Sequence, residues 1–487
     1  MRNASAMSSD VLGKYLSERI PRYTSYPTAP HFSAAVGPAR YREWLGELRP
    51  SERLSLYLHV PFCRTLCWYC GCNTSVTRHR EPVERYVAVL EREIGMVAAL
   101  ATPLANPDLG ALTGMVTDAL TGTQLWERGS AVPMQPASTN KVLTAAAALS
   151  TLDRGARLTT TVAVADQQRQ PGLVVLVGAG DPTLSPAPRG QDTLYRDAAR
   201  ISDLADQVRR SGITPTAVAV DTSAFSGPTM APGWDPADID GGDVAPIESV
   251  MVDGGRTQPL TPESIRSTTP ALDAGRSLAI ALGVDPKTVT TLNTPTEGRR
   301  QIASVQSPPL TERLRQMMNE SDNVMAECIA REVAVATHRP ASFAGAVEAV
   351  GARLAAAKVD MGGARLMDAS GLSADDRLTA STLDGVVGAA AGPDQPSMRP
   401  LLDVLPIAGG SGTLSNRYTG TAPDAAAAGW LRAKTGSLTG TNTLAGIVTD
   451  VSGRVLTFAL MSNNAGPTGR TAIDALAATL RSCGCGS

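Results

Sequence analysis

A serine and a lysine three residues apart are the first residues in this sequence whose types and spacing could support nucleophilic chemistry. Ser138 and Lys141 open the stretch STNKVLTAAAALSTLD, which is apolar nearly all round and therefore predicts a buried helix. Residues at i and i+3 share one face of a helix, so the hydroxyl and the amine should meet at its first turn. The chain has five Lys against 39 Arg, and of these two cations only a lysine can lose its proton and act as a base. We therefore interpret Ser138 as a nucleophile and Lys141 as its base.

Two further motifs follow in the C-terminal part of the chain. Ser321-Asp322-Asn323 interrupts the helical stretch TERLRQMMNESDNVMAECIAREV, and alone it could be no more than a helix cap. Lys434-Thr435-Gly436 occurs in LRAKTGSLTGTNTLAGIVTD, and we expect it at the start of a strand. The turn DVSGR should then lead into VLTFALMS as an antiparallel partner. Each motif is weak alone, and the weight of the argument comes from all three in this order.

In this order, the three motifs resemble those of penicillin-binding proteins and class A β-lactamases. Ser138 and Ser321 are 183 residues apart, which is more than a compact β-lactamase has room for. We expect an inserted, mostly β domain at 160–285 within a catalytic domain formed by 99–159 and 286–487. Residues 101–485 are similar to the D-alanyl-D-alanine carboxypeptidase/endopeptidase family, the class C low-molecular-mass penicillin-binding proteins of actinobacterial type. Further segments that carry this resemblance are VGAGDPTL, DTSAFSGPTMAPGW, DASGLSADDRLT and LPIAGGSGTL.

The resemblance implies a multidomain α/β (α+β) fold with a transpeptidase-like domain, an antiparallel sheet flanked by helices. It implies a serine peptidase that needs no cofactor, acts on the D-Ala-D-Ala peptides of peptidoglycan and is acylated by β-lactams. By the same resemblance Ser321 would relay a proton to the leaving amine and Asn323 would bind the substrate amide. Lys434 would supply a positive charge, and Thr435 a hydroxyl, for the terminal carboxylate of the substrate.

The same resemblance makes the residues after Lys434 a substrate-binding strand, with Thr435, Gly436 and Ser437 as its contacts. The backbone N–H groups of Ser138 and Ser437 would form the oxyanion hole. Such donors act on charge that develops only in the transition state.

The first hundred residues contain a second group that could do chemistry, a set of closely spaced cysteines. Residues 53–62 (RLSLYLHVPF) alternate apolar and polar, which predicts a strand, and a helix opened by Pro82 should follow the loop after it. Cys63, Cys67 and Cys70 lie in that loop with the spacing Cys-x3-Cys-x2-Cys. Three thiolates can hold three irons of a [4Fe–4S] cluster and leave the fourth iron open. We interpret this unit as a candidate iron–sulfur site.

The segments PRYTSYPTAPHF and LYLHVPFCRTLCWYCGCNT resemble the start of oxygen-independent coproporphyrinogen oxidases, which are radical S-adenosylmethionine (SAM) enzymes. The resemblance implies that the three cysteines ligate the cluster and that Tyr57 lies near SAM. It covers residues 10–98 and then stops, before the strands that would close a barrel around SAM. One strand and one helix cannot bury a barrel interior, so we expect a truncated fragment, residues 1–98, that does not bind SAM.

Composition limits the partners and the location that we expect. The formal charge of -2 at pH 7 gives no electrostatic reason to expect nucleic acid, and no apolar run is long enough for a transmembrane helix. The N-terminus has no apolar stretch of the kind found in signal peptides. The family implies an extracytoplasmic location, whereas the chain as written would be expected in the cytoplasm. The two halves therefore favour different compartments, and the simplest hypothesis is a chimera whose enzymatic half is the C-terminal one.

Two alternatives compete with this hypothesis. The chain could be a radical SAM redox protein of heme biosynthesis, similar to coproporphyrinogen oxidase, with an inert C-terminal domain. It could also be a penicillin-binding scaffold without turnover. Penicillin labelling separates the first alternative from the peptidase, and hydrolysis of a D-Ala-D-Ala peptide separates the second.

Overall fold

The computed structural model of the 487-residue chain describes residues 62–63, 75–87 and 103–482, apart from gaps at 165–167, 169, 259, 296–298 and 421–422. The chain forms two compact units, Met1–Val97 and Ala98–Ser487. The boundary lies next to the point at which the coproporphyrinogen-oxidase resemblance ends.

In the first unit, the described residues form one short strand pair and one helical turn. β1 (Phe62–Cys63) pairs in parallel with β2 (Ser75–Val76), and residues 81–87 are helical, where the sequence predicts the helix opened by Pro82. The rings of Phe62 and Tyr86 meet edge to face with centroids 5.6 Å apart. The predicted ligands Cys67 and Cys70, and Tyr57, lie outside the described residues.

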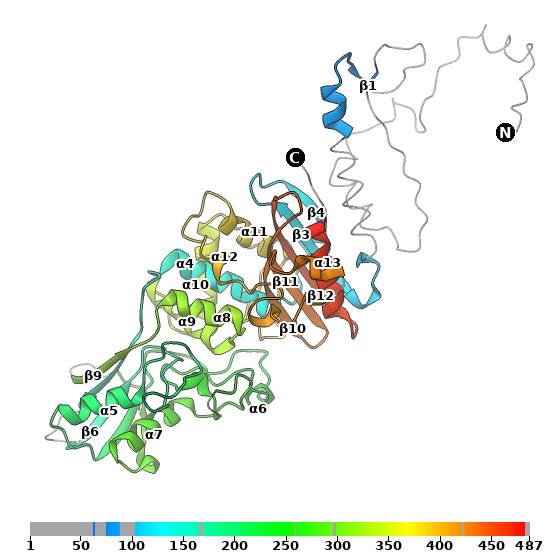
Figure 1. The fold of residues 1–487 in the computed structure, drawn as a ribbon. Coiled ribbons are helices and arrows are strands. Elements are labelled where there is room, and N and C mark those ends of the chain that lie inside the picture. Colours follow the sequence, from blue (N-terminus) through cyan, green and yellow to red (C-terminus); the bar gives the residue numbers. More distant parts are fainter. Residues whose placement is uncertain are drawn as a thin grey trace, which may run out of the picture. The chain divides into compact units, whose positions relative to one another are not determined.

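A five-stranded antiparallel sheet is the centre of the second unit (Figure 1), with the strand order β10-β11-β12-β3-β4. The antiparallel sheet flanked by helices that the sequence predicts is confirmed. Its strands are β3 (Ala111–Asp118), β4 (Gln124–Arg128), β10 (Leu431–Leu438), β11 (Thr441–Thr449) and β12 (Val455–Asn463). The N-terminal hairpin β3–β4 therefore joins the C-terminal strands, so the two ends of this unit complete one sheet.

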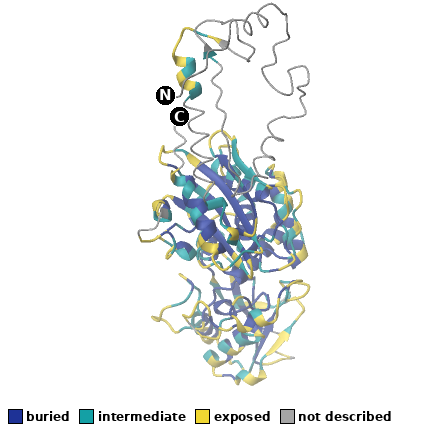
Figure 2. Cartoon of the chain, turned by 90° about the vertical axis from the view of Figure 1, so that its right-hand side faces the viewer, coloured by how far each residue is buried: buried dark blue, intermediate teal, exposed yellow. Residues whose placement is uncertain are grey.

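Helices cover both faces of this sheet because its strands alternate between two cores. Ala445, Ala459 and Met461 face one cluster of helices, while their neighbours Leu444 and Phe458 face the other side. The first face carries α4 (Lys141–Thr151), α8 (Leu310–Asn319), α9 (Asn323–Ala336), α10 (Phe343–Ala356), α11 (Ala380–Ala391) and α12 (Leu401–Val404). The second face packs against α13 (Gly469–Ser482). Figure 2 shows this sheet and its neighbouring helices as the buried interior of the unit.

A second five-stranded sheet lies between α4 and α8 in the sequence and has the order β8-β7-β6-β5-β9. Its strands are β5 (Thr159–Val164), β6 (Leu173–Val177), β7 (Ala217–Asp221), β8 (Thr290–Leu292) and β9 (Arg300–Gln306). The same segment forms α5 (Ile201–Arg210), α6 (Ala237–Asp240) and α7 (Pro270–Leu282), and α5 and α7 pack on the sheet. This sheet therefore draws on residues beyond 285, the end of the expected insertion, because β8 and β9 complete it.

The two sequence motifs that lie on regular elements are placed slightly differently from what we expected. Ser138 lies in a 3-10 helix, η3 (Ala137–Asn140), and the α-helix α4 begins only at Lys141. Lys434 lies in the middle of β10, not at its start, because the strand already begins at Leu431. The expected interruption at the Ser321 motif is present, since α8 ends at Asn319 and α9 begins at Asn323.

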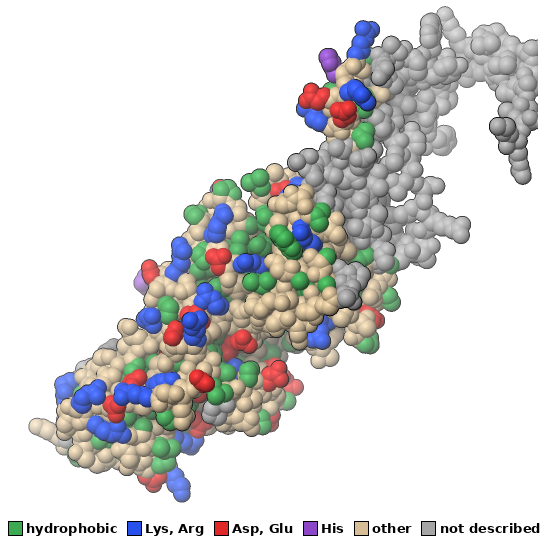
Figure 3. Space-filling view, viewed as in Figure 1, with side chains coloured by type: hydrophobic (Ala, Val, Ile, Leu, Met, Phe, Trp, Pro, Cys, Tyr) green, Lys and Arg blue, Asp and Glu red, His purple; other side chains and the backbone are tan. Residues whose placement is uncertain are grey.

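Shorter 3-10 turns complete the described part of the second unit. They are η2 (Pro107–Leu109), η4 (Asp253–Gly255), η5 (Pro286–Thr288), η6 (Gly412–Leu414) and η7 (Pro423–Ala427). Within the described ranges, none of the helices has both the length and the apolar character needed to cross a bilayer. In Figure 3 acidic and basic side chains are interspersed over the face of this unit that is shown.

Candidate active site

Ser138 lies at the entrance of α4, half-buried, on the short 3-10 turn η3. The residue before it, Ala137, has φ 46°, in the left-handed region that a residue with a side chain rarely adopts. Thr139 Oγ1 donates to the Pro136 carbonyl at 2.6 Å and Thr443 Oγ1 donates to the same carbonyl at 2.7 Å. These two bonds fix the turn against strand β11, so the position of the Ser138 hydroxyl is set by the sheet as well as by the helix.

Lys141 is fully buried, and its ammonium group makes three hydrogen bonds. Nζ lies 2.9 Å from Ser138 Oγ, 2.5 Å from Asn323 Oδ1 and 2.8 Å from the Ser370 carbonyl oxygen. Burial lowers the pKa of Lys141 to about 8, although the nearby carboxylates Asp368 and Asp322 oppose this shift. A lysine with this pKa is partly deprotonated near neutral pH, which a base requires.

The Asn323 side chain connects Lys141 to the segment between α6 and α7, which contains Asp243. Its Oδ1 faces Lys141, and its Nδ2 donates to the Asp243 carbonyl at 3.0 Å. Because each end of the amide has a partner of the right kind, its orientation is defined. Asn323 therefore presents an acceptor, not a donor, to the lysine.

Ser321 and Lys434 form a second serine–lysine pair in the same site. Lys434 Nζ lies 2.9 Å from Ser321 Oγ and 2.8 Å from the Thr435 carbonyl, and the Lys434 side chain is fully buried. Burial, together with the charges of Lys141 and Arg417, lowers the pKa of Lys434 well below its usual range. Ser321 has φ 58°, so its backbone is held in a conformation that is unfavourable for a residue with a side chain.

Strand β10 passes very close to the turn that carries Ser138, and Gly436 makes this approach possible. A Cβ at Gly436 would lie 2.1 Å from Thr443 Oγ1 and 2.8 Å from the Pro136 carbonyl oxygen. Beside it, Thr435 Oγ1 donates to Thr413 Oγ1 at 2.8 Å, and Ser437 is exposed to solvent. The Lys-Thr-Gly strand therefore forms one wall directly next to the Ser138 hydroxyl.

The sequence did not assign a role to the loop that supplies the third partner of Lys141. This loop begins at Asp368, which is completely buried and accepts from the N–H groups of Ser370, Gly371 and Ser373 at 2.6–3.0 Å. Trp234 Nε1 donates to the same carboxylate at 2.7 Å. The Asp-x-Ser-Gly pattern of a side chain capping its own turn was the available signal, but the group that contacts Lys141 is a backbone carbonyl, which no residue type reveals.

A cleft of about 1840 Å³ opens over these groups. Ser138, Ser321, Asn323, Thr435 and Ser437 line it, so the structure brings together the two serines, the asparagine and the strand residues that the sequence singled out. Lys141 and Lys434 lie beneath its floor. Side chains between β7 and α7, including those of Asp243 and Arg256, line the cleft as well. The walls of the cleft therefore come both from the elements around the antiparallel sheet and from the segment that forms the second sheet.

Within the residues that the structure describes, no group of three His, Cys, Asp or Glu side chains is arranged to hold a metal ion. The side chains of the three predicted cluster ligands, Cys63, Cys67 and Cys70, lie outside the part of the chain that this statement covers. The iron–sulfur site therefore stays a prediction.

The N-terminal segment is similar to part of a known oxidase. It is 51% identical over 92 residues to the oxygen-independent coproporphyrinogen III oxidase of Bradyrhizobium diazoefficiens, which is 19% of this chain and 20% of that one. The resemblance of this segment to oxygen-independent coproporphyrinogen oxidases is confirmed. Because four fifths of the oxidase have no counterpart in the match, the activity of the oxidase is not carried over.

The second unit is similar to carboxypeptidases of mycobacteria. A carboxypeptidase DacB of Mycolicibacterium smegmatis is 72% identical over 393 residues, 81% of this chain and 85% of the relative. A carboxypeptidase of Mycobacterium tuberculosis is 67% identical over 391 residues, 80% of this chain and 84% of the relative. The fold is shared with penicillin binding protein 4 (dacB) from Haemophilus influenzae, with a TM-score of 0.66 at 22% identity over 79% of this chain and 98% of that one.

The expected peptidase family is confirmed, and the radical SAM alternative is not favoured. The model of the D-Ala-D-Ala carboxypeptidase 3 (S13) family matches residues 96–264 and 257–482, which include all three motifs. The chain therefore belongs to the D-Ala-D-Ala carboxypeptidase 3 (S13) family of hydrolases.

Proposed function

We propose that this chain is a serine-type D-Ala-D-Ala carboxypeptidase that forms an acyl-enzyme on Ser138 and is acylated there by β-lactams. The observation that carries the proposal is the contact between Lys141 Nζ and Ser138 Oγ at 2.9 Å on the floor of an open cleft. A nucleophile and a base within hydrogen-bond reach, with the base held by a third group, are the usual requirements for covalent catalysis.

The partners of Lys141 direct its lone pair at Ser138. A neutral amine has two hydrogens and one lone pair. The Asn323 Oδ1 atom and the Ser370 carbonyl oxygen can only accept, so they take the two hydrogens. The lone pair is then left for the Ser138 hydroxyl, and the deprotonated lysine is oriented as a base.

In the acylation step, Ser138 Oγ adds to the carbonyl carbon between the two D-alanines while its proton passes to Lys141 Nζ. The N–H groups of Ser138 and Ser437 stabilise the oxyanion, and losing one such donor typically costs about 2.7–4 kcal/mol of barrier. The C–N bond then breaks, and the leaving amine takes a proton from the Ser321 hydroxyl. Water later hydrolyses the Ser138 ester and releases the shortened peptide.

Lys434 assists the proton transfer from Ser321 to the leaving amine. Its ammonium contacts Ser321 Oγ and can replace the proton that the serine gives up. Burial makes the charged form of Lys434 costly in the free enzyme. A substrate carboxylate bound at Thr435 would favour the ammonium form, so binding of the C-terminal carboxylate prepares the proton donor.

The substrate that we propose is the peptide of peptidoglycan, which places the reaction in the cell envelope. The test uses a diacetyl-L-Lys-D-Ala-D-Ala tripeptide and measures release of free D-alanine by the wild type and by Ser138→Ala. We expect release by the wild type alone. Penicillin labelling without any release of D-alanine would instead favour a penicillin-binding scaffold.

A further inference from the structure

Asp322 stands between the two residues that the proposed mechanism uses, Ser321 and Asn323, and lines the same cleft, but the mechanism gives its side chain no chemical role. Its Oδ1 accepts from the N–H of Met325 at 2.9 Å and caps the start of α9. Its Oδ2 accepts from Tyr195 Oη at 2.6 Å and from Arg256 Nη2 at 3.2 Å. Both of these partners lie in the segment between β6 and α7, far away in sequence.

Arg256 is enclosed by acceptors. Its Nη1 donates to Tyr195 Oη at 2.7 Å and to the Asp253 carbonyl at 3.1 Å, and its Nε donates to the Pro262 carbonyl at 3.0 Å. The side chains of Arg256 and Asp322 are 5% and 1% exposed. Burial raises the pKa of Asp322 in principle, but the charges of Arg256 and Arg266 outweigh it and lower the pKa, so the carboxylate stays ionised.

The backbone at Gly254, next to this ion pair, leaves room for the side chains of Tyr195 and Arg256. Gly254 has φ 61°, and a Cβ there would lie 2.5 Å from Tyr195 Oη and 2.8 Å from Arg256 Nη1. Arg266 Nη1 donates to the Gly254 carbonyl at 2.6 Å and holds the turn in place. A side chain at position 254 would therefore displace both partners of Asp322.

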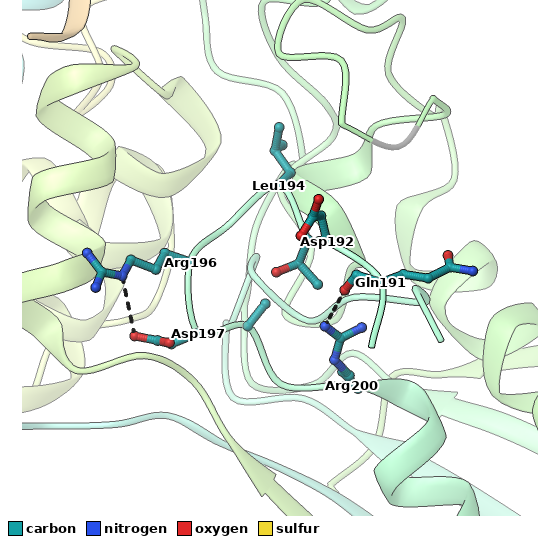
Figure 4. A pocket seen from close by; sticks show the side chains of 8 residues that line it. Gln191, Asp192, Leu194, Arg196, Asp197 and Arg200 are labelled. Carbon is teal, nitrogen blue, oxygen red and sulfur yellow. Dashed lines mark hydrogen bonds and ion pairs between the residues drawn. The ribbon is translucent and has the colours of Figure 1, made fainter. Parts of the chain in front are cut away.

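The loop that carries Tyr195 is braced independently of the site. Arg200 donates to the carbonyls of Ala187, Pro188 and Gln191 at 2.6–2.9 Å, and Thr193 Oγ1 donates to the Tyr195 carbonyl at 2.7 Å. Figure 4 shows the bond from Arg200 to Gln191 beside the open pocket that this loop lines. The Tyr195 hydroxyl is thus presented to Asp322 from a loop with its own supports.

We propose that Arg256 and Tyr195 are positioning residues, which hold Asp322 so that Ser321 faces Lys434 and Asn323 faces Lys141. This inference rests on the proposed function. The strained backbone of Ser321 needs a neighbour that is firmly held, because a relaxed conformation would move its hydroxyl away from Lys434. Arg256 and Tyr195 thus form a clamp on the Asp322 side chain. This clamp connects the segment between β6 and α7 to the catalytic groups at Ser321 and Asn323.

Two variants test the clamp by the kinetics of penicillin acylation, with binding and chemistry measured separately. Tyr195→Phe removes one hydroxyl and keeps the ring and the ion pair. We expect it to slow the acylation step about tenfold, the size expected for one hydrogen bond to a charged group, with little change in the preceding binding constant. Arg256→Gln should slow acylation further.

The pH dependence provides a readout that loss of structure would not move. The carboxylates around Lys141 are those of Asp368, Asp322, Glu327 and Asp243, and Asp322 alone is paired with Arg256. Without Arg256, the charge of Asp322 is compensated only by that of Arg266, so it favours the ammonium form of Lys141 more strongly. The acid limb of the acylation profile should therefore move to higher pH in Arg256→Gln.

The matched control is Arg276→Gln, which removes an exposed arginine from the ion pair with Asp273 on α7 and should leave acylation unchanged. If Arg256→Gln does not fold, Tyr195→Phe decides the question. Acylation of Tyr195→Phe at the wild-type rate would overturn the clamp, as would an Arg256→Gln profile with an unmoved acid limb. A wild type that penicillin does not acylate would instead overturn the proposed function.

Discussion

Lys141 Nζ lies 2.9 Å from Ser138 Oγ, and the other two hydrogen-bond partners of this amine are acceptors only. The pair therefore has one arrangement in which the neutral lysine faces the serine hydroxyl with its lone pair. The following predictions depend on this arrangement and on the surrounding walls of the cleft.

The rate of acylation should rise with the fraction of Lys141 that is deprotonated. Burial lowers its pKa to about 8, and the base is active only when deprotonated. The second-order rate constant of penicillin acylation should therefore fall below pH 8 and level off above it. Stopped-flow measurements on both sides of pH 8 check this, and a rate that declines as the pH rises through 8 would argue against a lysine base.

The two active-site lysines should respond differently to arginine. Lys141→Arg should lower acylation by about 10²–10⁴-fold, because guanidinium cannot act as a general base. Lys434→Arg should lower it less, because Arg keeps the positive charge for the terminal carboxylate of the substrate. Arg cannot return a proton to Ser321, so part of the loss should appear in the acylation step. The comparison uses acylation rates of both variants at neutral pH, with thermal unfolding to verify that the larger side chain is accommodated at the buried position 434. Equal losses, or a larger loss at 434, would mean that proton removal from Ser138 must be reassigned.

Gly436 should not tolerate a methyl group. In Gly436→Ala the new Cβ would overlap Thr443 Oγ1 and the Pro136 carbonyl, so strand β10 would have to move away from the Ser138 turn. We expect acylation to fall at least tenfold, the effect of displacing a positioned group. The control is Gly351→Ala on α10, where a Cβ would meet no other atom, so both stability and acylation should be kept. Unchanged acylation in Gly436→Ala would show that the close approach of β10 is not needed.

The catalytic unit should work without the N-terminal one. The sheet, the flanking helices and the cleft are all built from residues after Ala98. A variant that lacks residues 1–98 should therefore be labelled by fluorescent penicillin at the rate of the full chain. Loss of soluble protein in this variant would show that the two units depend on each other.

The sequence predicted the local part of the site and missed the part that depends on distant contacts. Ser138 and Lys141 are one turn apart, so helical geometry alone brings them together. The pairing of Lys434 with Ser321 could be inferred only through the family resemblance, because the two residues meet through tertiary packing. The Ser370 carbonyl and the Arg256–Asp322 pair had no signal in spacing: the first is a backbone group and the second joins two segments 66 residues apart.

The fold shows the same division. The turn between β11 and β12 was predicted from its turn residues, and the break before Asn323 from the interruption of a helical stretch. The start of β10 was predicted too late, because Leu431–Ala433 precede the motif without a marked turn signal, and their strand character comes from pairing with β11. The inserted domain was expected to end at 285, before β8 and β9, since the pairing of these strands with earlier ones is not visible in a local pattern.

The central claim is that Ser138 is the nucleophile, and mass spectrometry of the acyl-enzyme tests it most directly. The full chain and Ser138→Ala are treated with benzylpenicillin, and the intact masses and the peptide that contains position 138 are measured. We predict one penicilloyl adduct per wild-type chain, located on Ser138, and none on Ser138→Ala. An adduct of equal yield on Ser138→Ala, or one located on Ser321 in the wild type, would contradict the account.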